Sequence, residues 1–171
     1  CGVGGGPGGI CFGLKKVFGK HVHCFFAEPT HSPAMLLGMM TGLHNKITVQ
    51  KFGIDNKTAA DGLAVGKPSK FVGKIMENIL AGIYTVQDEV FFTLLKTLYE
   101  ENSIKLEPSA LAGFPGVGHV SKNYSKFNFL KDKKPKNTLE KSTHLIWATD
   151  GSMVPQDIFN DYIKQFKNGQ L

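Results

Sequence analysis

The first nine residues of the chain contain six glycines, and this stretch restricts what the chain can form more than any other. It reads Cys-Gly-Val-Gly-Gly-Gly-Pro-Gly-Gly and is followed by a segment, 10–18, whose apolar residues have helical spacing. Glycine is costly in regular structure because it loses the most backbone freedom on folding. Such a stretch is useful where backbone N–H groups must approach an anion just ahead of a helix. We therefore expect a phosphate-binding loop at residues 1–9.

Two common phosphate-binding patterns can be compared with this stretch. The Walker pattern is excluded, because no Gly-Lys-Ser/Thr closes the loop. The dinucleotide pattern G-x-G-x-x-G fits at Gly4, Gly6 and Gly9, and an acidic residue, Glu28, follows about twenty positions on. The strand that should precede such a loop is missing. A non-catalytic nucleotide- or phosphate-binding module of Rossmann type stays open as an alternative.

Composition limits the function classes. The 171 residues, 42% of them hydrophobic, suffice for the core of one domain. The sequence opens without Met inside the glycine stretch, so we expect a piece of a longer chain. The net charge of +6 comes from Lys without any Arg, and the densest Lys run, 131–136, is broken by Asp and Pro, which is typical of a solvated loop. We expect neither nucleic acid nor a membrane as partner.

The three cysteines contain no C-x-x-C pair and give no disulfide framework or zinc spacing. Cysteines used in this way suit a reducing compartment. We therefore expect a cytoplasmic location.

Strand-like and helix-like segments alternate along the chain. The segments expected as strands are 21–28, 47–52, 83–86, 104–107 and 143–149. The segments expected as helices are 10–18, 34–41 (with Ser32 as its cap), 69–80, 87–101, a stretch starting at 110, and 155–166. Such alternation predicts an α/β fold with a layered, mostly parallel sheet and helices on both faces.

Polar residues follow several of the expected strands. They are Glu28, Asp61 and Gly62 in the long irregular segment 55–68, Glu107 and Thr149. Ligands of open parallel sheets bind beyond the carboxyl ends of the strands. We expect one cleft to collect these residues beside the glycine stretch.

Five motifs in a fixed order carry a family resemblance. They are Cys-Gly-Val-Gly-Gly-Gly-Pro-Gly-Gly, His-Cys-Phe-Phe-Ala-Glu-Pro-Thr-His-Ser-Pro, Thr-Ala-Ala-Asp-Gly-Leu-Ala-Val-Gly, Leu-Glu-Pro-Ser-Ala and His-Leu-Ile-Trp-Ala-Thr. Together they closely resemble the C-terminal half of D-serine dehydratases (D-serine ammonia-lyases), which are pyridoxal-phosphate enzymes of the tryptophan-synthase-β fold type, fold type II. The resemblance implies that residues 1–171 are the C-terminal portion of the cofactor-binding domain, with the N-terminal half of the enzyme absent.

The resemblance also implies roles for individual residues. The glycines that would hold the cofactor phosphate are Gly2, Gly4, Gly5 and Gly6. The pair Asp61 and Gly62 would lie along the cofactor ring, and the Thr149 hydroxyl would contact the pyridine nitrogen. Glu28 would support a cation, such as potassium. Where the family has Gly after this threonine, the present chain has Asp150.

The implied reaction is conversion of D-serine to pyruvate and ammonia by β-elimination. The family's Schiff-base lysine belongs to the N-terminal half, and Lys70, in Pro-Ser-Lys, lies too far along the chain to replace it. The resemblance therefore implies a fragment that is inactive alone and needs the missing half as its partner. A threonine dehydratase or threonine synthase relative is a further alternative, since the residues that choose the substrate lie mostly outside this chain.

Overall fold

The computed structural model describes residues 1–123, 126–127, 141–149 and 151–168. Its strands are β1 (Phe25–Pro29) and β2 (Gly82–Val86). Its α-helices are α1 (Gly5–Phe18), α2 (Ala34–Met40), α3 (Lys70–Met76), α4 (Asp88–Asn102), α5 (Gly116–Lys122) and α7 (Gln156–Asn168). Short 3-10 helices connect them: η1 (Gly19–His21), η2 (His44–Lys46), η3 (Val49–Phe52), η4 (Asp61–Leu63) and η5 (Pro108–Leu111). Strands and helices alternate, as predicted.

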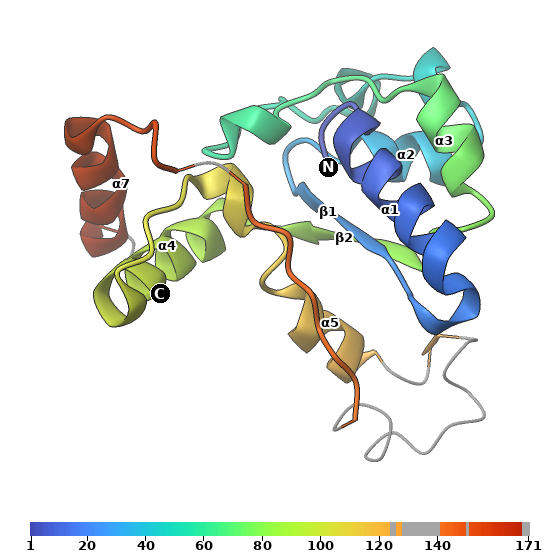
Figure 1. The fold of residues 1–171 in the computed structure, drawn as a ribbon. Coiled ribbons are helices and arrows are strands. Elements are labelled where there is room, and N and C mark those ends of the chain that lie inside the picture. The colour runs from blue at the N-terminus through green and yellow to red at the C-terminus, as the bar shows by residue number, and fades with distance from the viewer. Residues whose placement is uncertain (124–125, 128–140, 150, 169–171) are drawn as a thin grey trace.

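The two strands form a parallel sheet in the middle of the molecule (Figure 1). Phe26 lies opposite Ile83 and Ala27 opposite Tyr84. Parallel neighbours require a long crossover connection, which here carries α2 and α3. The prediction of a parallel sheet is confirmed.

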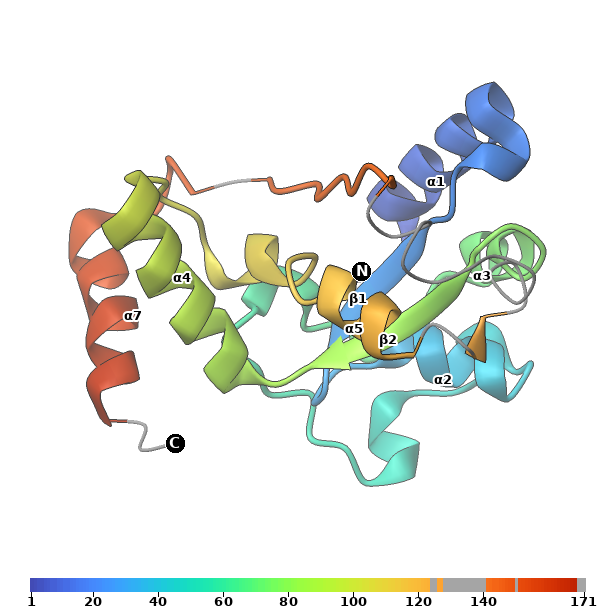
Figure 2. The ribbon, with the colours of Figure 1, turned by 90° about the horizontal axis from the view of Figure 1, so that it is seen from below.

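Helices cover both faces of this sheet, and the side-chain alternation of β1 decides which core each residue joins. Phe26 packs with Met35 and Val72 in a cluster formed with α1, α2 and α3. Ala27, its neighbour, points the other way into a cluster with Phe91 of α4. Figures 1 and 2 show α1, α2 and α3 gathered at one side of the strands. The expectation of helices on both faces is confirmed.

The C-terminal helix α7 lies beside α4 (Figure 2). Phe159 of α7 is fully buried, and its ring meets that of Tyr99 edge-on at a centroid distance of 4.9 Å. Aromatic contacts of this kind fix α7 to a helix that itself follows β2 directly.

Three predicted strands do not form. Segment 47–52 contains the helix η3, which ends at Gly53 with a φ of 76°. Segments 104–107 and 143–149 are neither helix nor strand. A strand is stable only when a neighbouring strand pairs with it. Trp147 lies in a segment that was predicted to be a strand, and its side chain is 57% exposed.

The helix predictions need smaller corrections. The first helix begins at Gly5 rather than at residue 10, so four of the six glycines of residues 1–9 lie within it. The stretch starting at 110 forms only the 3-10 helix η5, and α5 was not predicted, since Gly116 and Gly118 interrupt its pattern. Among the described residues, no helix has the length and apolar character needed to cross a membrane.

Candidate functional site

The glycine stretch forms the start of α1. Gly4 is the N-cap residue with a φ of 109°, a conformation that favours glycine. The first helical hydrogen bond runs from the Gly8 N–H to the Gly4 carbonyl at 2.8 Å. The N–H groups of Gly5 and Gly6 precede that bond, so they have no partner within the helix. A 14-residue helix adds the positive end of its dipole at the same place.

The glycines divide into two groups by their surroundings. A Cβ on Gly4 would lie 2.5 Å from the Met35 side chain, and one on Gly8 would lie 2.7 Å from Val72. These two glycines are buried and allow α1 to pack closely on α2 and α3. Around Gly5, Gly6 and Gly9 a Cβ would meet nothing within 4 Å, and all three are exposed. Packing within this chain therefore does not account for the exposed group.

The predicted ring-contacting segment comes next to the glycine stretch. A Cβ on Gly2 would lie 3.3 Å from the Gly62 carbonyl oxygen and 3.2 Å from Val65. The Ser69 N–H donates to the Val3 carbonyl at 3.0 Å. The structure thus brings Gly2 and Gly62 together, as the expectation of one cleft requires.

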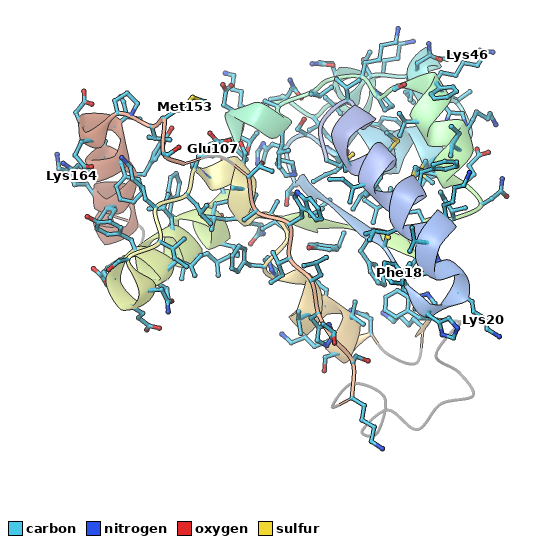
Figure 3. The ribbon with its side chains drawn as sticks, in the orientation of Figure 1. Phe18, Lys20, Lys46, Glu107, Met153 and Lys164 are labelled. Carbon is cyan, nitrogen blue, oxygen red and sulfur yellow. The ribbon has the colours of Figure 1, made fainter. Side chains whose placement is uncertain are left out.

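Residues of η5 complete this neighbourhood. The Gly62 N–H donates to the Ser109 hydroxyl at 3.0 Å, and a Cβ on Gly62 would lie 3.5 Å from a Glu107 carboxylate oxygen. Glu107 also lines a hollow with Gly151 and Met153, and Figure 3 shows Glu107 and Met153 near each other, toward α7. Glu107, expected at a strand exit, lies beside Gly62 although no strand precedes it, and its place in one cleft with the glycine stretch stays a prediction.

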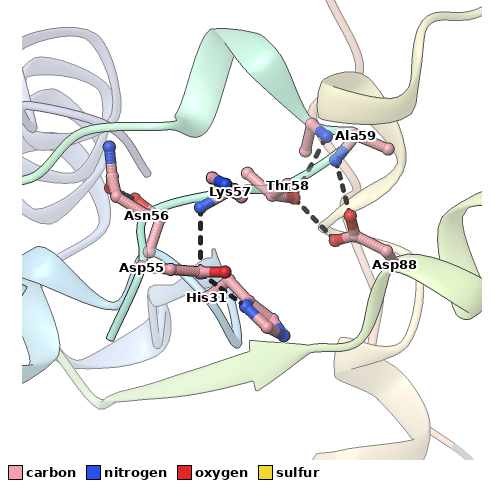
Figure 4. A network of polar contacts seen from close by, with 9 residues as sticks. His31, Asp55, Asn56, Lys57, Thr58, Ala59 and Asp88 are labelled. Atoms are coloured by element: carbon pink, nitrogen blue, oxygen red, sulfur yellow. Dashed lines mark hydrogen bonds and ion pairs between the residues drawn. The ribbon is translucent and has the colours of Figure 1, made fainter. Parts of the chain in front are cut away.

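The loop that carries Asp61 and Gly62 runs across the carboxyl ends of both strands (Figure 4). Beyond β1, the His31 imidazole contacts the Asp55 carboxylate at 2.8 Å. This hydrogen bond raises the pKa of His31 and lowers that of Asp55. Beyond β2, the Asp88 carboxylate accepts hydrogen bonds from the Thr58 hydroxyl and the Ala59 N–H at 2.6 and 2.5 Å.

The Ser32 side chain bonds to the loop that carries Asp61 and Gly62 and does not cap α2. Its buried hydroxyl donates to the Asn56 side-chain oxygen at 2.8 Å and accepts from the Val65 N–H at 2.9 Å. The N-cap residue of α2 is Pro33, which has no capping side chain. The prediction of Ser32 as helix cap is wrong, because another side chain supplies the acceptors that the helix needs.

That side chain is Glu28. It is fully buried, and its two carboxylate oxygens accept the N–H groups of Met35 and Leu36 at 2.9 Å each. Burial raises its pKa to about 7. Because Glu28 is fully buried, its carboxylate cannot reach the hydroxyls of a ribose, so the dinucleotide interpretation of Gly4, Gly6, Gly9 and Glu28 loses its acidic residue.

Two further observations bear on the predicted sites. The Cys1 nitrogen donates to the Ala27 carbonyl, which ties the start of the glycine stretch to β1. The described residues contain no group of three or more His, Cys, Asp or Glu side chains that could hold a metal ion. Glu28 is the one acidic residue in β1.

Thr149 is exposed at the end of the irregular segment 141–149. Positions on either side of it follow the backbone of residues 105–113: a Cβ on Gly113 would meet Ile146 at 3.1 Å, and one on Gly151 would meet the Lys105 carbonyl oxygen. The segment thus lies beside residues 105–113, and the place of Thr149 in one cleft with the glycine stretch stays a prediction. Asp150 and the Lys run 131–136 lie outside the described residues.

Sequence reasoning missed Ser109 and Asp88. Ser109 stands inside the Leu-Glu-Pro-Ser-Ala motif, so its presence in that motif was a usable signal. Asp88 opens the clearest helical pattern, where an acidic residue is expected for the helix dipole alone. Its contact with a loop thirty residues earlier cannot be read from spacing.

A family model described as pyridoxal-phosphate dependent enzyme matches residues 1–128. A protein from Geobacillus stearothermophilus named probable D-serine dehydratase is 53% identical over 165 residues. One of the same name from Bacillus cereus (strain AH187) is 58% identical over 164 residues. Each match covers 96% of this chain but only 36% of the relative.

Solved structures show the same fold at low sequence identity. The processed form of threonine deaminase isoform 2 from Solanum lycopersicum superposes with a TM-score of 0.66 at 16% identity, covering 99% of this chain and 41% of that one. Maize serine racemase gives a TM-score of 0.62 at 16% identity, covering 98% of this chain and 46% of that one. The predicted fold class, a partial fold-type II large domain, is confirmed by these neighbours.

Proposed function

Because this chain belongs to the family of pyridoxal-phosphate-dependent enzymes, we propose that it is the C-terminal, cofactor-binding portion of a D-serine ammonia-lyase. Relatives that are 53% and 58% identical carry the name probable D-serine dehydratase, and the chain spans 36% of their length. The observation that carries the proposal is the open backbone of Gly5 and Gly6 at the start of α1. The reaction assigned is conversion of D-serine to pyruvate and ammonia.

The residues present fit the phosphate group of the cofactor. The N–H groups of Gly5 and Gly6 have no partner within the helix, and no side-chain or backbone atom comes within 4 Å of the space that their Cβ atoms would take. Backbone N–H groups and a helix N-terminus together stabilise a bound phosphate. Gly4 contributes by its left-handed conformation, which turns the chain into α1, and Gly2 by its close approach to Gly62.

The remaining site residues have separate roles in the proposal. When bound, pyridoxal phosphate supplies an aldehyde for the substrate amino group and a ring that withdraws electrons from the α-carbon. Asp61 and Gly62 would lie along that ring. The Thr149 hydroxyl would contact the ring nitrogen, and a hydroxyl, unlike a carboxylate, does not hold that nitrogen protonated. This setting favours elimination of the substrate hydroxyl.

We also propose Glu28 as the support of a cation such as potassium. Each of its oxygens accepts one N–H group, and a carboxylate oxygen has a second lone pair. Hard cations of this kind prefer such oxygens together with backbone carbonyls. Equal enzyme activity in potassium chloride and in tetramethylammonium chloride would contradict this role.

The missing part of the enzyme would dock on apolar surface that the present chain leaves exposed. On α1, Phe12 is 52% exposed, Val17 74% and Phe18 53%. Exposed apolar patches commonly mark interaction surfaces. We assign residues 1–171 to the cofactor-binding domain and the covalent anchoring lysine to the remaining part.

The test uses the full open reading frame that encodes this chain. We expect the purified enzyme to show the visible absorption of bound pyridoxal phosphate and to release pyruvate from D-serine, with less from L-serine and D-threonine. A colourless protein without turnover would contradict the proposal, and a preference for threonine would favour the threonine dehydratase alternative. Residues 1–171 alone should release no pyruvate, since they lack the anchoring lysine.

A substitution at Gly6 separates binding from folding. We expect Gly6→Ala to leave the free energy of unfolding unchanged or slightly higher, because Ala is the better helix former and meets nothing within 4 Å. The added methyl should instead occupy space that the phosphate needs and weaken cofactor binding about tenfold or more. Titration of the apoenzyme with pyridoxal phosphate measures this effect. Unchanged affinity would show that the phosphate lies elsewhere.

A further inference from the structure

The loop of residues 55–65 is irregular but is held at several points along its length. The carboxylate of its first residue, Asp55, contacts the His31 imidazole, and the N–H of its last residue, Val65, donates to the Ser32 hydroxyl. Between them, Ala60 is fully buried in the core that contains Phe91. Since an irregular loop is ordinarily mobile, so many contacts from different elements indicate that its shape matters.

Asp88 makes the contacts nearest to the predicted ring-contacting pair. Its two carboxylate oxygens accept from two consecutive residues, Thr58 and Ala59 (Figure 4). The Thr58 hydroxyl in turn accepts from the Ala60 N–H at 3.1 Å. Three successive residues are therefore tied, directly or through one hydroxyl, to a single charged group. Hydrogen bonds to a charged acceptor are about twice as strong as neutral ones.

Asp88 stands at the junction between β2 and α4, between two buried residues. Asp88 is the first residue of α4, directly after Gln87, and Val86 at the end of β2 is buried. One turn further, Phe91 is fully buried beneath the loop. A side chain anchored at a strand–helix junction is a more precise support than one on another loop.

Ser109 fixes the other side of the pair. Its hydroxyl accepts from the Gly62 N–H at 3.0 Å. Between the two anchors, Asp61 and Gly62 form the helical turn η4, with the Ala64 N–H bonded to the Asp61 carbonyl at 2.9 Å. With Ala59 and Gly62 both held, the backbone of this turn has little freedom to move relative to Gly2.

We propose that Asp88 is a positioning residue of the cofactor site: its carboxylate holds residues 58–60 so that the turn at Asp61 and Gly62 is preformed against the glycine stretch. This inference rests on the proposed function, because it assigns Asp88 a role toward the cofactor that Asp61 and Gly62 would contact. Asp88 itself touches neither cofactor nor substrate and acts through the loop.

The test compares Asp88→Ala with Glu89→Gln in the complete enzyme. Glu89 is exposed in the same first turn of α4, so its replacement removes the same helix-end charge without touching the loop. We expect Asp88→Ala to raise the dissociation constant for pyridoxal phosphate about tenfold and to speed hydrogen exchange in residues 57–63. Glu89→Gln should leave both within about twofold, and Thr58→Ser, which keeps the hydroxyl, should resemble the wild type.

Equal effects of Asp88→Ala and Glu89→Gln would overturn the inference in favour of helix-end charge, as would faster exchange without weaker binding. If Asp88→Ala fails to fold, Thr58→Val removes one of the two contacts and should weaken binding about threefold; unchanged binding would overturn the inference. A wild-type enzyme that takes up no pyridoxal phosphate would instead overturn the proposed function, and the inference with it.

Discussion

Replacing Gly4 by Ala should lower the free energy of unfolding by about 3 kcal/mol or more. The residue has a φ of 109°, and holding a side chain in a sparsely populated conformation of this kind costs about 1–3 kcal/mol. Its new Cβ would lie 2.5 Å from the terminal methyl of the buried Met35, which would have to shift within the core, and 3.0 Å from Val72. Overpacking of a core adds about 1–3 kcal/mol. Urea unfolding followed by circular dichroism measures the loss.

The matched control is Gly9→Ala in the same helix. Gly9 is exposed, its Cβ would meet nothing within 4 Å, and Ala is better than Gly in a helix interior by about 0.5–1 kcal/mol. The two substitutions add the same methyl group to α1 with opposite expected signs. A similar loss for both would show that the glycines serve general flexibility, and not the packing of α1 on α2 and α3.

The contrast between Gly4 and Gly9 shows which features of the glycine stretch can be predicted from the sequence. The run of glycines predicts a backbone that comes close to something, and helical spacing predicts the helix behind it. It does not reveal that Gly4 and Gly8 face Met35 and Val72 while Gly6 faces open space. Those neighbours come from α2 and α3, and tertiary contacts between distant segments leave no trace in local spacing.

The same limit explains the strand errors. Segments 25–29 and 82–86 pair with each other and form strands close to those predicted. Segment 143–149 has the same apolar character but remains unpaired in the described structure, with Leu145 69% exposed. Strand formation depends on a pairing partner that the segment itself does not encode. The expectation that Thr149 follows a strand is therefore wrong, and its place in the site is a prediction from the family resemblance alone.

The sequence identified Glu28 as a candidate site residue but did not predict its hydrogen bonds to α2. Its position at the end of a strand suggested a ligand-binding acid, whereas the structure shows both oxygens bonded to the start of α2. The first residues of any helix need such acceptors. Pro33 cannot supply one, and Ser32 is engaged with Asn56 and Val65.

Replacing Glu28 by Ala should therefore destabilise the protein by about 2–4 kcal/mol. The buried Met35 N–H would lose its only acceptor in the described structure, at a cost of about 1–3 kcal/mol, and the partly buried Leu36 N–H would lose less. Glu28→Gln keeps one acceptor oxygen and should cost less than Glu28→Ala at pH 7. Equal losses for the two variants in urea unfolding would show that the hydrogen bonds to α2 contribute little.

The pH dependence gives an independent measurement of the same carboxylate. Burial raises the pKa of Glu28 from 4.5 to about 7, so between these values the folded protein binds the proton more tightly than the unfolded chain does. Its contribution to stability is then fully present below pH 4.5 and is lost as the pH rises through 7.

The comparison uses the complete enzyme and a variant in which residue 28 does not titrate. Glu28→Gln resembles the protonated acid and does not titrate. Relative to this variant, the wild type should lose about 1–3 kcal/mol of unfolding free energy between pH 5 and pH 7.5. A constant difference between the two proteins over that range would mean that Glu28 is ionised throughout, held by the α2 N–H groups more strongly than burial opposes its charge.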